Sequence, residues 1–252
     1  MQLGVDVELR LKNVSKVYEN DGKQMPTVDD VNLKISKRES VAILGPSGCG
    51  KTTLIRMIAG LEMPTSGSIY FHGRPLTEPD RHIMMVFQSF ALLPWKTVYD
   101  NIELALLDKP NSDRKAIVDK YIHLIGLEGF SETYPRDLSG GMKQRVGIAR
   151  ALCREPDILI LDDAFSGLDQ LTSRNLQNEI LRYYKDRRTK PDVLLLITHN
   201  IQEAVYMADR VIVLSSRPGH IVADMKIDLE KPKNMRDKRF QDYVDEITSL
   251  IT

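Results

Sequence analysis

The sequence is poor in several features that would point to particular classes of protein. Its 252 residues include two cysteines and one tryptophan, and 35 lysines and arginines balance 35 aspartates and glutamates. The cysteines, Cys49 and Cys153, match no metal or disulfide framework, and we expect both to be reduced thiols. A formal net charge of zero gives no overall basic field, so we predict no nucleic-acid partner.

Long apolar runs are also missing. Even a run such as Val193–Ile197 is far shorter than the roughly 20 residues that a membrane-spanning helix needs. The N-terminus lacks the basic and apolar regions of an export signal, so we expect a cytosolic protein without a membrane span. A chain of this length can hold one large α/β domain, or a core domain with a smaller inserted one.

The most informative stretch is Gly45–Thr52, which follows the apolar run Ser40–Leu44 and leads into the helical pattern Thr53–Ile58. Its glycines allow successive backbone N–H groups to face an anion, and the helix start adds its dipole. Lys51 can reach the outer phosphates, and the Thr52 hydroxyl is a suitable ligand for Mg²⁺. The spacing matches the phosphate-loop pattern at every fixed position and therefore predicts a polyphosphate site.

Alternating apolar residues before this loop predict strands at Val7–Leu11, Val14–Tyr18 and Val28–Ile35. We therefore expect an antiparallel β layer at the front of the chain. Tyr18 ends one of these strands. It is equally compatible with a half-buried sheet tyrosine and with a ring that stacks on a nucleobase.

The middle of the chain predicts an inserted helical lobe at about residues 89–155, because apolar residues recur there at helical spacing. A buried strand, Ile83–Phe87, precedes this lobe and ends at Gln88. The next segment, Ser89–Trp95, is apolar although it contains a proline, which suggests a loop that contacts a partner. Alternatively, Trp95 and its apolar neighbours cover the protein's own core.

A Ser-Gly-Gly sequence at Ser139, Gly140 and Gly141 precedes the helical run Lys143–Leu152. Ser139 is placed as the N-cap, and the glycines leave the helix start open to a phosphate other than the one in the phosphate loop. A simple capped helix start is the alternative.

Two further strands end in polar residues. Ile158–Leu161 delivers Asp162 and Asp163 at its carboxyl end, where parallel sheets bind ligands, and Asp162 is well placed to hold Mg²⁺ opposite Thr52. The two carboxylates could instead cap the helix predicted at 170–185. The strand 193–197 ends at Thr198 and His199. His199 could contact a terminal phosphate or the attacking water, although a lone histidine is more often structural.

The last predicted element is a C-terminal tail helix at about residues 236–251. Phe240, Val244, Ile247 and Ile251 share one face of it. We expect that face to pack on the protein's own body rather than on a partner.

Taken in the order in which they occur, these motifs make the chain resemble the ATP-binding subunit of an ABC transporter over nearly its whole length. The features that carry the resemblance are the phosphate loop, Gln88, Leu138–Met142, Asp162 with Asp163, Ser166–Asp169 and His199. Finer features resemble the nitrate/sulfonate/taurine importer branch. They are Phe87–Gln88, Ala91–Trp95, the methionine Met142 that closes the signature, and Arg217–Gly219.

The resemblance implies a single ABC ATP-binding domain over residues 1–252: a RecA-like α/β core with an antiparallel β layer and an inserted helical lobe. Two such subunits, identical or sister chains, would sandwich two ATP molecules head to tail. The residues that would hold ATP in one subunit are Tyr18 on adenine and Gly45, Pro46, Ser47, Gly48, Cys49, Gly50, Lys51, Thr52 and Thr53 on the phosphates. Ser139, Gly140 and Gly141 would reach the γ-phosphate bound by the opposite subunit.

For hydrolysis the resemblance implies Mg²⁺ held by Thr52, Gln88 and Asp162, with Gln88, Asp163 and His199 as the catalytic set. Asp169 would link the two sites. The loop ending at Trp95 would meet a transmembrane permease at the cytoplasmic face of the membrane. A separate substrate-binding protein would supply a small oxyanion or sulfonate.

The chain departs from the family pattern at Asp163 and Ala164, where Glu and Pro are usual, and at Asn200, where Asp is usual. These departures predict slow hydrolysis. They also favour an alternative, a hydrolysis-impaired dimerisation subunit paired with a competent sister ATPase. A third possibility is a soluble ABC ATPase of DNA repair or translation. The neutral charge, the single cassette and the apolar loop all count against it.

Overall fold

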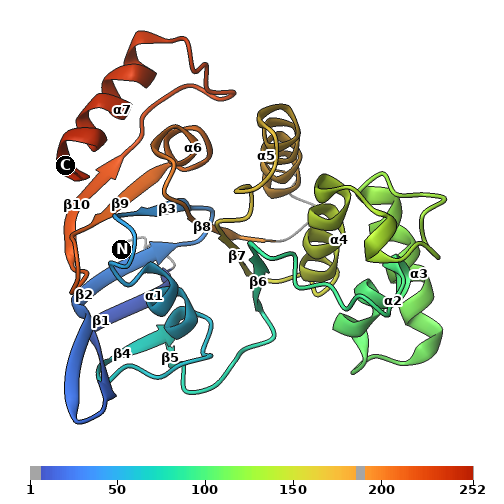
Figure 1. Ribbon diagram of the computed structural model, residues 1–252, viewed down its shortest axis with the longest axis horizontal. Helices are drawn as coiled ribbons and strands as arrows, with labels where there is room; N and C mark the ends of the chain where they lie inside the picture. The colour runs from blue at the N-terminus through green and yellow to red at the C-terminus, as the bar shows by residue number, and fades with distance from the viewer. Residues whose placement is uncertain (1–6, 186–190, 252) are drawn as a thin grey trace, which may run out of the picture. The chain divides into compact units, whose positions relative to one another are not determined.

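The computed structural model describes residues 7–185 and 191–251, which fall into two units (Figure 1). Unit 1 combines the N-terminal part up to Asp80 with the C-terminal part from Asp192, and unit 2 contains the described residues from Arg81 to Pro191. No helix within 7–185 or 191–251 combines the length and the apolar character needed to span a membrane.

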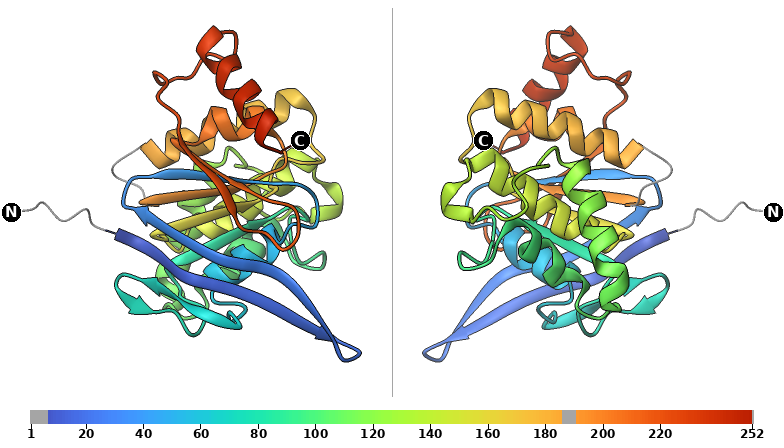
Figure 2. Two further views of the ribbon diagram at one scale, coloured as in Figure 1. Left: turned by 90° about the vertical axis from the view of Figure 1, so that its left-hand side faces the viewer. Right: turned by 90° about the vertical axis from the view of Figure 1, so that its right-hand side faces the viewer.

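The first layer of unit 1 is an antiparallel sheet, as the sequence predicts. Its strands are β1 (Val7–Asn20), β2 (Lys23–Ser36), β4 (Ser66–Phe71) and β5 (Arg74–Pro75), in the order β2-β1-β4-β5. The separate strands expected at 7–11 and 14–18 are wrong, because they form one long strand that pairs with β2 along its length (Figure 2). A register shift between Leu11 and Val14, with Asn13 at φ +48°, lets both apolar side chains stay buried despite the broken alternation.

The second layer of unit 1 is built on β3 (Ser40–Leu44), which is buried at every position. It pairs in parallel with β8 (Val193–Ile197) on one side and β9 (Arg210–Leu214) on the other. β10 (Ile221–Lys226) runs antiparallel to β9, with which it forms a hairpin. Continuous apolar strands of this kind are typical of a parallel sheet buried on both faces.

The described residues of unit 1 form the helices α1 (Lys51–Ile58), α6 (Ile201–Met207) and α7 (Lys238–Ile251). The side chains of Phe240 and Ile247 on α7 are fully buried, and α7 lies beside α6 (Figure 1). The apolar face of the tail helix thus packs within unit 1.

Unit 2 contains one parallel strand pair, β6 (Ile83–Phe87) and β7 (Ile158–Asp162). The chain between these strands forms only helices: α2 (Val98–Glu103), η1 (Leu104–Leu106), α3 (Asn111–Leu124), η2 (Pro135–Asp137) and α4 (Gly140–Leu152). α4 packs on α2, α3 and β6, and α5 (Gln170–Lys185) follows β7 (Figure 1).

Both cysteines are buried free thiols, as expected. Burial raises the pKa of Cys153, at the end of α4, to about 12. Such a thiol stays protonated at neutral pH and packs as a small apolar group.

Candidate functional site

The phosphate loop lies between β3 and α1, as the sequence predicts. Gly50 precedes α1 with φ +106°, and a Cβ atom there would lie 2.6 Å from the Thr27 carbonyl oxygen, so only glycine fits. Among the residues that the structure describes, no side chain caps the start of α1. Its first N–H groups, which have no partner inside the helix, are therefore available to an anion.

The ammonium group of Lys51 folds back over this loop. Its Nζ atom donates hydrogen bonds to the carbonyl oxygens of Gly45 at 2.7 Å and Pro46 at 2.9 Å. The side chain thereby places a positive charge inside the arc of the glycine-rich segment. A phosphate oxygen in this arc would meet both the ammonium group and the helix dipole.

The turn between β9 and β10 packs closely against the backbone of the phosphate loop. A Cβ atom at Gly219 would lie 2.2 Å from the Cys49 carbonyl oxygen. The Gly219 N–H donates to the Thr27 carbonyl oxygen, and the Gly219 carbonyl oxygen accepts the Asp29 N–H. The sequence indicated this glycine only through the resemblance to the importer branch. Its physical role is to let the turn approach the backbone of the phosphate loop.

Tyr18 is half-buried near the end of β1 and lies beside the phosphate-loop helix. Its hydroxyl donates to Glu62 Oε2 at 2.6 Å and lies 3.4 Å from Thr53 Oγ1, while Lys16 Nζ is 5.2 Å from the ring centroid. Burial raises the pKa of Tyr18, and the bond to Glu62 raises it further, so the phenol stays neutral. The structure therefore brings Tyr18 directly against Thr53 and ties it to Glu62, a residue that the sequence pattern did not indicate.

His199 is exposed and lies between β8 and α6. The Thr198 hydroxyl donates to the Glu203 carboxylate and accepts the Asn200 N–H at 3.0 Å, and Asn200 Oδ1 accepts the Glu203 N–H at 3.1 Å. Asn200 is thus the N-cap of α6, a position that Asn and Asp fill equally well. The departure from the family pattern at Asn200 leaves this cap intact.

In unit 2 the polar ends of two strands meet. Phe87 is the register partner of Asp162 at the end of the β6–β7 pair, so Gln88 and Asp163 each follow a paired residue at the same carboxyl edge. The structure therefore brings together Gln88, Asp162 and Asp163.

Asp163 adopts a left-handed backbone with φ +48°. Its carbonyl oxygen accepts hydrogen bonds from the Ser166 N–H at 3.1 Å and the Ser166 hydroxyl at 2.9 Å. A non-glycine residue with positive φ that is fixed in this way is typical of functional sites.

The Ser-Gly-Gly segment forms the start of α4. Ser139 Oγ accepts the Met142 N–H at 3.2 Å, which confirms the predicted N-cap, and Ser139 remains exposed. A Cβ atom at Gly141 would lie 2.6 Å from the Thr172 methyl group, so this glycine lets α4 begin close to α5.

The alternative that Asp162 and Asp163 cap α5 is wrong for a simple reason: Asp169 provides the cap. Its Oδ1 atom accepts the Thr172 N–H at 3.0 Å, and this bond lowers the pKa of the Asp169 carboxyl. Asp162 and Asp163 lie seven and six positions before this cap, too far along the chain to serve as an N-cap.

The apolar loop after β6 is fixed by hydrogen bonds from a buried side chain, and its tryptophan is exposed. Trp95 is 70% exposed, so it does not cover the core. Asn101, which is fully buried, accepts the Leu93 N–H at 2.8 Å and donates to the carbonyl oxygens of Lys96 and Thr97, both at 2.9 Å. This buried amide fixes the loop, and no sequence pattern indicated it.

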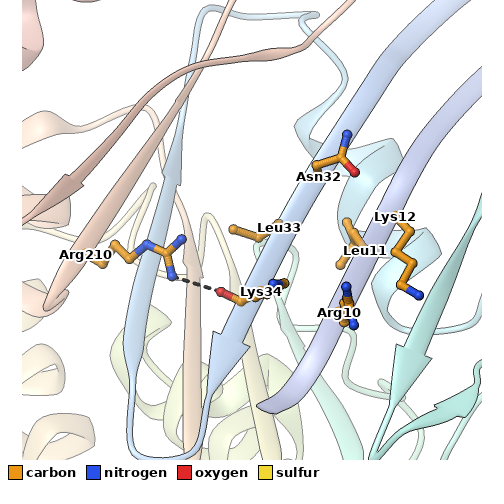
Figure 3. A pocket seen from close by; sticks show the side chains of 7 residues that line it. All are labelled: Arg10, Leu11, Lys12, Asn32, Leu33, Lys34 and Arg210. Carbon is orange, nitrogen blue, oxygen red and sulfur yellow. Dashed lines mark hydrogen bonds between the residues drawn. The ribbon is translucent and has the colours of Figure 1, made fainter. Parts of the chain in front are cut away.

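A further pocket of about 270 Å³ lies in unit 1 (Figure 3) and contains none of the predicted site residues. It is lined by Arg10, Leu11, Lys12, Asn32, Leu33, Lys34 and Arg210. The Arg210 guanidinium donates to the Lys34 carbonyl oxygen at 2.9 Å, to Glu39 at 3.0 Å and to both carboxylate oxygens of Asp224. The Lys12 Nζ atom lies 5.0 Å from the centroid of the Tyr70 ring. Lys12 and Arg210, two of the four cationic residues in the lining, therefore have partners within the protein.

Comparison with known proteins agrees with this geometry. The family model described as ABC transporter matches residues 28–166, more than half of the 252-residue chain. The chain belongs to the ABC transporter family.

Relatives of this ABC protein include import subunits. It is 41% identical to the nitrate import ATP-binding protein NrtD of Synechococcus elongatus, over 84% of this chain and 81% of that one. It is 36% identical to the aliphatic sulfonates import ATP-binding protein SsuB of Bacillus thuringiensis subsp. konkukian, over 92% of this chain and 90% of that one. These similarities confirm the predicted branch of the ABC family.

A solved ABC structure supports the fold. The chain resembles an ATP-binding cassette dimer in a post-hydrolysis state, bound to ADP and Pi, with a TM-score of 0.77 and 31% identity, over 87% of this chain and 98% of that one. The predicted ABC ATPase fold is therefore correct.

Proposed function

We propose that this chain is the ATP-binding and hydrolysing subunit of an ABC importer, which energises uptake of a small oxyanion or sulfonate through a separate permease. The observation that carries the proposal is the phosphate loop, with an uncapped helix start and the Lys51 ammonium folded over Gly45 and Pro46. The import functions named for its nitrate and sulfonate relatives support the solute class.

In this proposal, Tyr18 stacks on the adenine ring and Gly45–Thr53 bind the phosphates. The tether from Tyr18 to Glu62 supports this role, because it fixes the ring beside the phosphate-loop helix. Thr52, Gln88 and Asp162 supply hydroxyl, amide and carboxylate oxygens, the ligand types that Mg²⁺ prefers. The bound ion would neutralise charge on the phosphates.

Hydrolysis would use Asp163 to orient or deprotonate the attacking water, with Gln88 and His199 near the terminal phosphate. Asp is one C–C bond, about 1.5 Å, shorter than the usual Glu. We therefore propose slow turnover with normal ATP affinity. If turnover is negligible, the chain would serve as the hydrolysis-impaired partner of a competent sister subunit.

The assembly would contain two ATP-binding subunits at the cytoplasmic face of the membrane, transmembrane permease subunits and, indirectly, a substrate-binding protein. The exposed Ser139 cap supports contact with the nucleotide of an opposite subunit, as does the similarity to a dimeric cassette. The exposed Trp95, on a loop fixed by Asn101, supports attachment to the permease.

Replacement of Ser139 by arginine tests the shared site. We expect Ser139→Arg to bind MgATP as tightly as the unmodified chain in a titration, yet to remain monomeric in size-exclusion chromatography with ATP. Ser112→Arg, at an exposed position near the start of α3, is the matched control and should dimerise. Loss of ATP binding by the Ser139 monomer would show that Ser139 acts within its own chain.

Purification of the chain from its native membrane tests the importer assignment. We expect a multi-span permease to co-purify with it, and ATP hydrolysis in that complex to rise when a solute-loaded binding protein is added. Isolation with ribosomes or DNA-repair proteins instead would contradict the importer proposal.

A further inference from the structure

The segment after β10 returns to elements that carry the nucleotide site. The Ile227 N–H donates to the Asp209 carbonyl oxygen at 2.8 Å, and the chain then passes Lys231 and Lys233 before α7. Figure 1 shows α7 beside α6, and Figure 2 shows the same neighbourhood from the side. These elements all belong to unit 1.

Lys233 is buried at the end of α6. Its side chain is 6% exposed, and Nζ donates to the carbonyl oxygens of Val205, at 2.8 Å, and Ala208. A buried ammonium group is costly unless its protons are bonded, and here it satisfies carbonyl groups at the negative end of the helix. Lys233 therefore fixes the C-terminal end of α6.

The opposite end of α6 begins directly after His199. Asn200 caps it, and Thr198 connects β8 to Glu203 in its first turn. α6 has only seven residues, and a helix this short depends on contacts at its ends rather than on its own propensity. We therefore expect a displacement of one end to move the backbone of His199 at the other.

A second lysine of the same segment reaches the base of the phosphate-loop strand. Lys231 forms an ion pair with Asp209, which also accepts the Ser40 hydroxyl at 2.7 Å. Burial alone would raise the pKa of Asp209, but the bonds from Lys231 and Ser40 hold it below its usual value. Ser40 begins β3, so the C-terminal segment contacts the His199 helix directly through Lys233 and is linked through Asp209 to the strand that leads to Gly45.

We propose that Lys233 is a positioning residue for ATP hydrolysis, through which the C-terminal segment fixes α6 and thereby His199. This inference rests on the function proposed above, in which His199 acts near the terminal phosphate. Lys233 itself would touch neither nucleotide nor water. Its effect should therefore appear in turnover and not in ATP affinity.

The test replaces Lys233 by methionine, which keeps the apolar stem and removes the ammonium group. Lys238→Met is the matched control, because Lys238 is an exposed lysine of the same segment. We expect kcat for ATP to fall by roughly ten- to a hundredfold in Lys233→Met, with KM and ATP affinity unchanged, because a small misplacement near the reacting groups has effects of this size. Lys238→Met should keep the original kcat.

Histidine NMR provides a readout that does not depend on turnover. The chain has five histidines, and the His199 ring signal can be assigned by its loss in His199→Gln. We expect Lys233→Met to shift or broaden the His199 signal and leave that of His72 in place. This measurement separates the inference from the proposed function, because it decides the case even if the isolated chain hydrolyses no ATP.

Val14→Ala is the control for a loss of stability that does not involve α6. It truncates a core side chain in β1, a strand that pairs only with β2 and β4 in the described chain. It should lower Tm while kcat and the His199 signal stay unchanged. If Lys233→Met does not fold, Lys233→Gln, which keeps an amide donor, should show smaller changes in the same direction. An unchanged His199 signal with unchanged kcat in a folded Lys233 variant would overturn the inference, as would equal losses in Val14→Ala.

Discussion

Unit 1 and unit 2 fix their predicted site residues in different ways. In unit 1 the side chains themselves have partners: Lys51 bonds to the phosphate-loop carbonyl groups and Tyr18 bonds to Glu62. In unit 2, Gln88, Ser139 and Trp95 are exposed, although Ser139 Oγ also accepts the Met142 N–H as the N-cap of α4. This contrast suggests that unit 1 is preorganised to bind nucleotide. In the proposed function, unit 2 would present side chains for hydrolysis and for contacts with other subunits.

If that contrast is correct, binding and hydrolysis should separate most clearly at Asp163. We expect Asp163→Asn to reduce single-turnover hydrolysis on the order of 10²- to 10⁴-fold, the usual contribution of a general base, while ATP affinity stays normal. Asp163→Glu should hydrolyse faster than the unmodified chain, by up to about 10²-fold, because the longer side chain corrects a misplacement of about 1 Å.

The backbone conformation of Asp163 could instead compensate for its shorter side chain. Its left-handed conformation is one that Asp tolerates better than most residues. Fast turnover in the unmodified chain and slower turnover in the Glu variant would show that this backbone has adapted to the shorter side chain. The impaired-site proposal would then be wrong.

The converse change in unit 1 should affect binding first. We expect Lys51→Ala to weaken ATP binding by at least about tenfold, because a hydrogen bond to a charged group contributes about 1.5–3 kcal/mol. Lys226→Ala, at an exposed position on β10, is the control for removal of one positive charge from the same unit. Thermal unfolding should change little in either variant, and an unchanged ATP titration for Lys51→Ala would contradict the phosphate-loop assignment.

Trp95 tests whether unit 2 presents a surface for a partner. Trp95→Ala should keep the ATPase rate of the isolated chain and weaken permease attachment by about 2 kcal/mol or more, as for an anchor residue in an interface. Asn101→Ala should weaken attachment as well, but it should also lower Tm, because it removes the buried amide bonds to the Leu93 N–H and to the Lys96 and Thr97 carbonyl oxygens. An equal loss of Tm in Trp95→Ala would favour a role in the core.

The smallest effect is expected at Asn200. Asn200→Asp restores the residue usual in the family, and both side chains cap α6 equally well, so the free energy of unfolding should change by no more than about 0.5 kcal/mol. Turnover should also stay close to that of the unmodified chain. A large gain in kcat would show that the residue after His199 affects hydrolysis beyond its role as a cap.

The parts of the site that are contiguous in the chain could be predicted from residue spacing. The phosphate loop and the Ser139 cap each depend on residues close together in the sequence, so their spacing already defines their geometry. The short, buried parallel-sheet strands were equally readable, because burial on both faces requires continuous apolar runs. The polar residues at their carboxyl ends, such as Gln88 and Asp163, could therefore be named from the sequence, although β7 ends at Asp162, one residue later than predicted.

The distant residues that support these positions are visible only in the folded chain. Glu62 meets Tyr18 across 44 residues, Arg150 holds the Phe90–Ala91 backbone across about 60, and Lys233 reaches α6 across more than 20. Strand register, likewise, brings Gln88 level with Asp163. Hydrogen bonds of this kind depend on how strands and helices pack, and local spacing carries no record of that packing. In the sequence, Asn101 and Lys233 therefore look like ordinary polar residues.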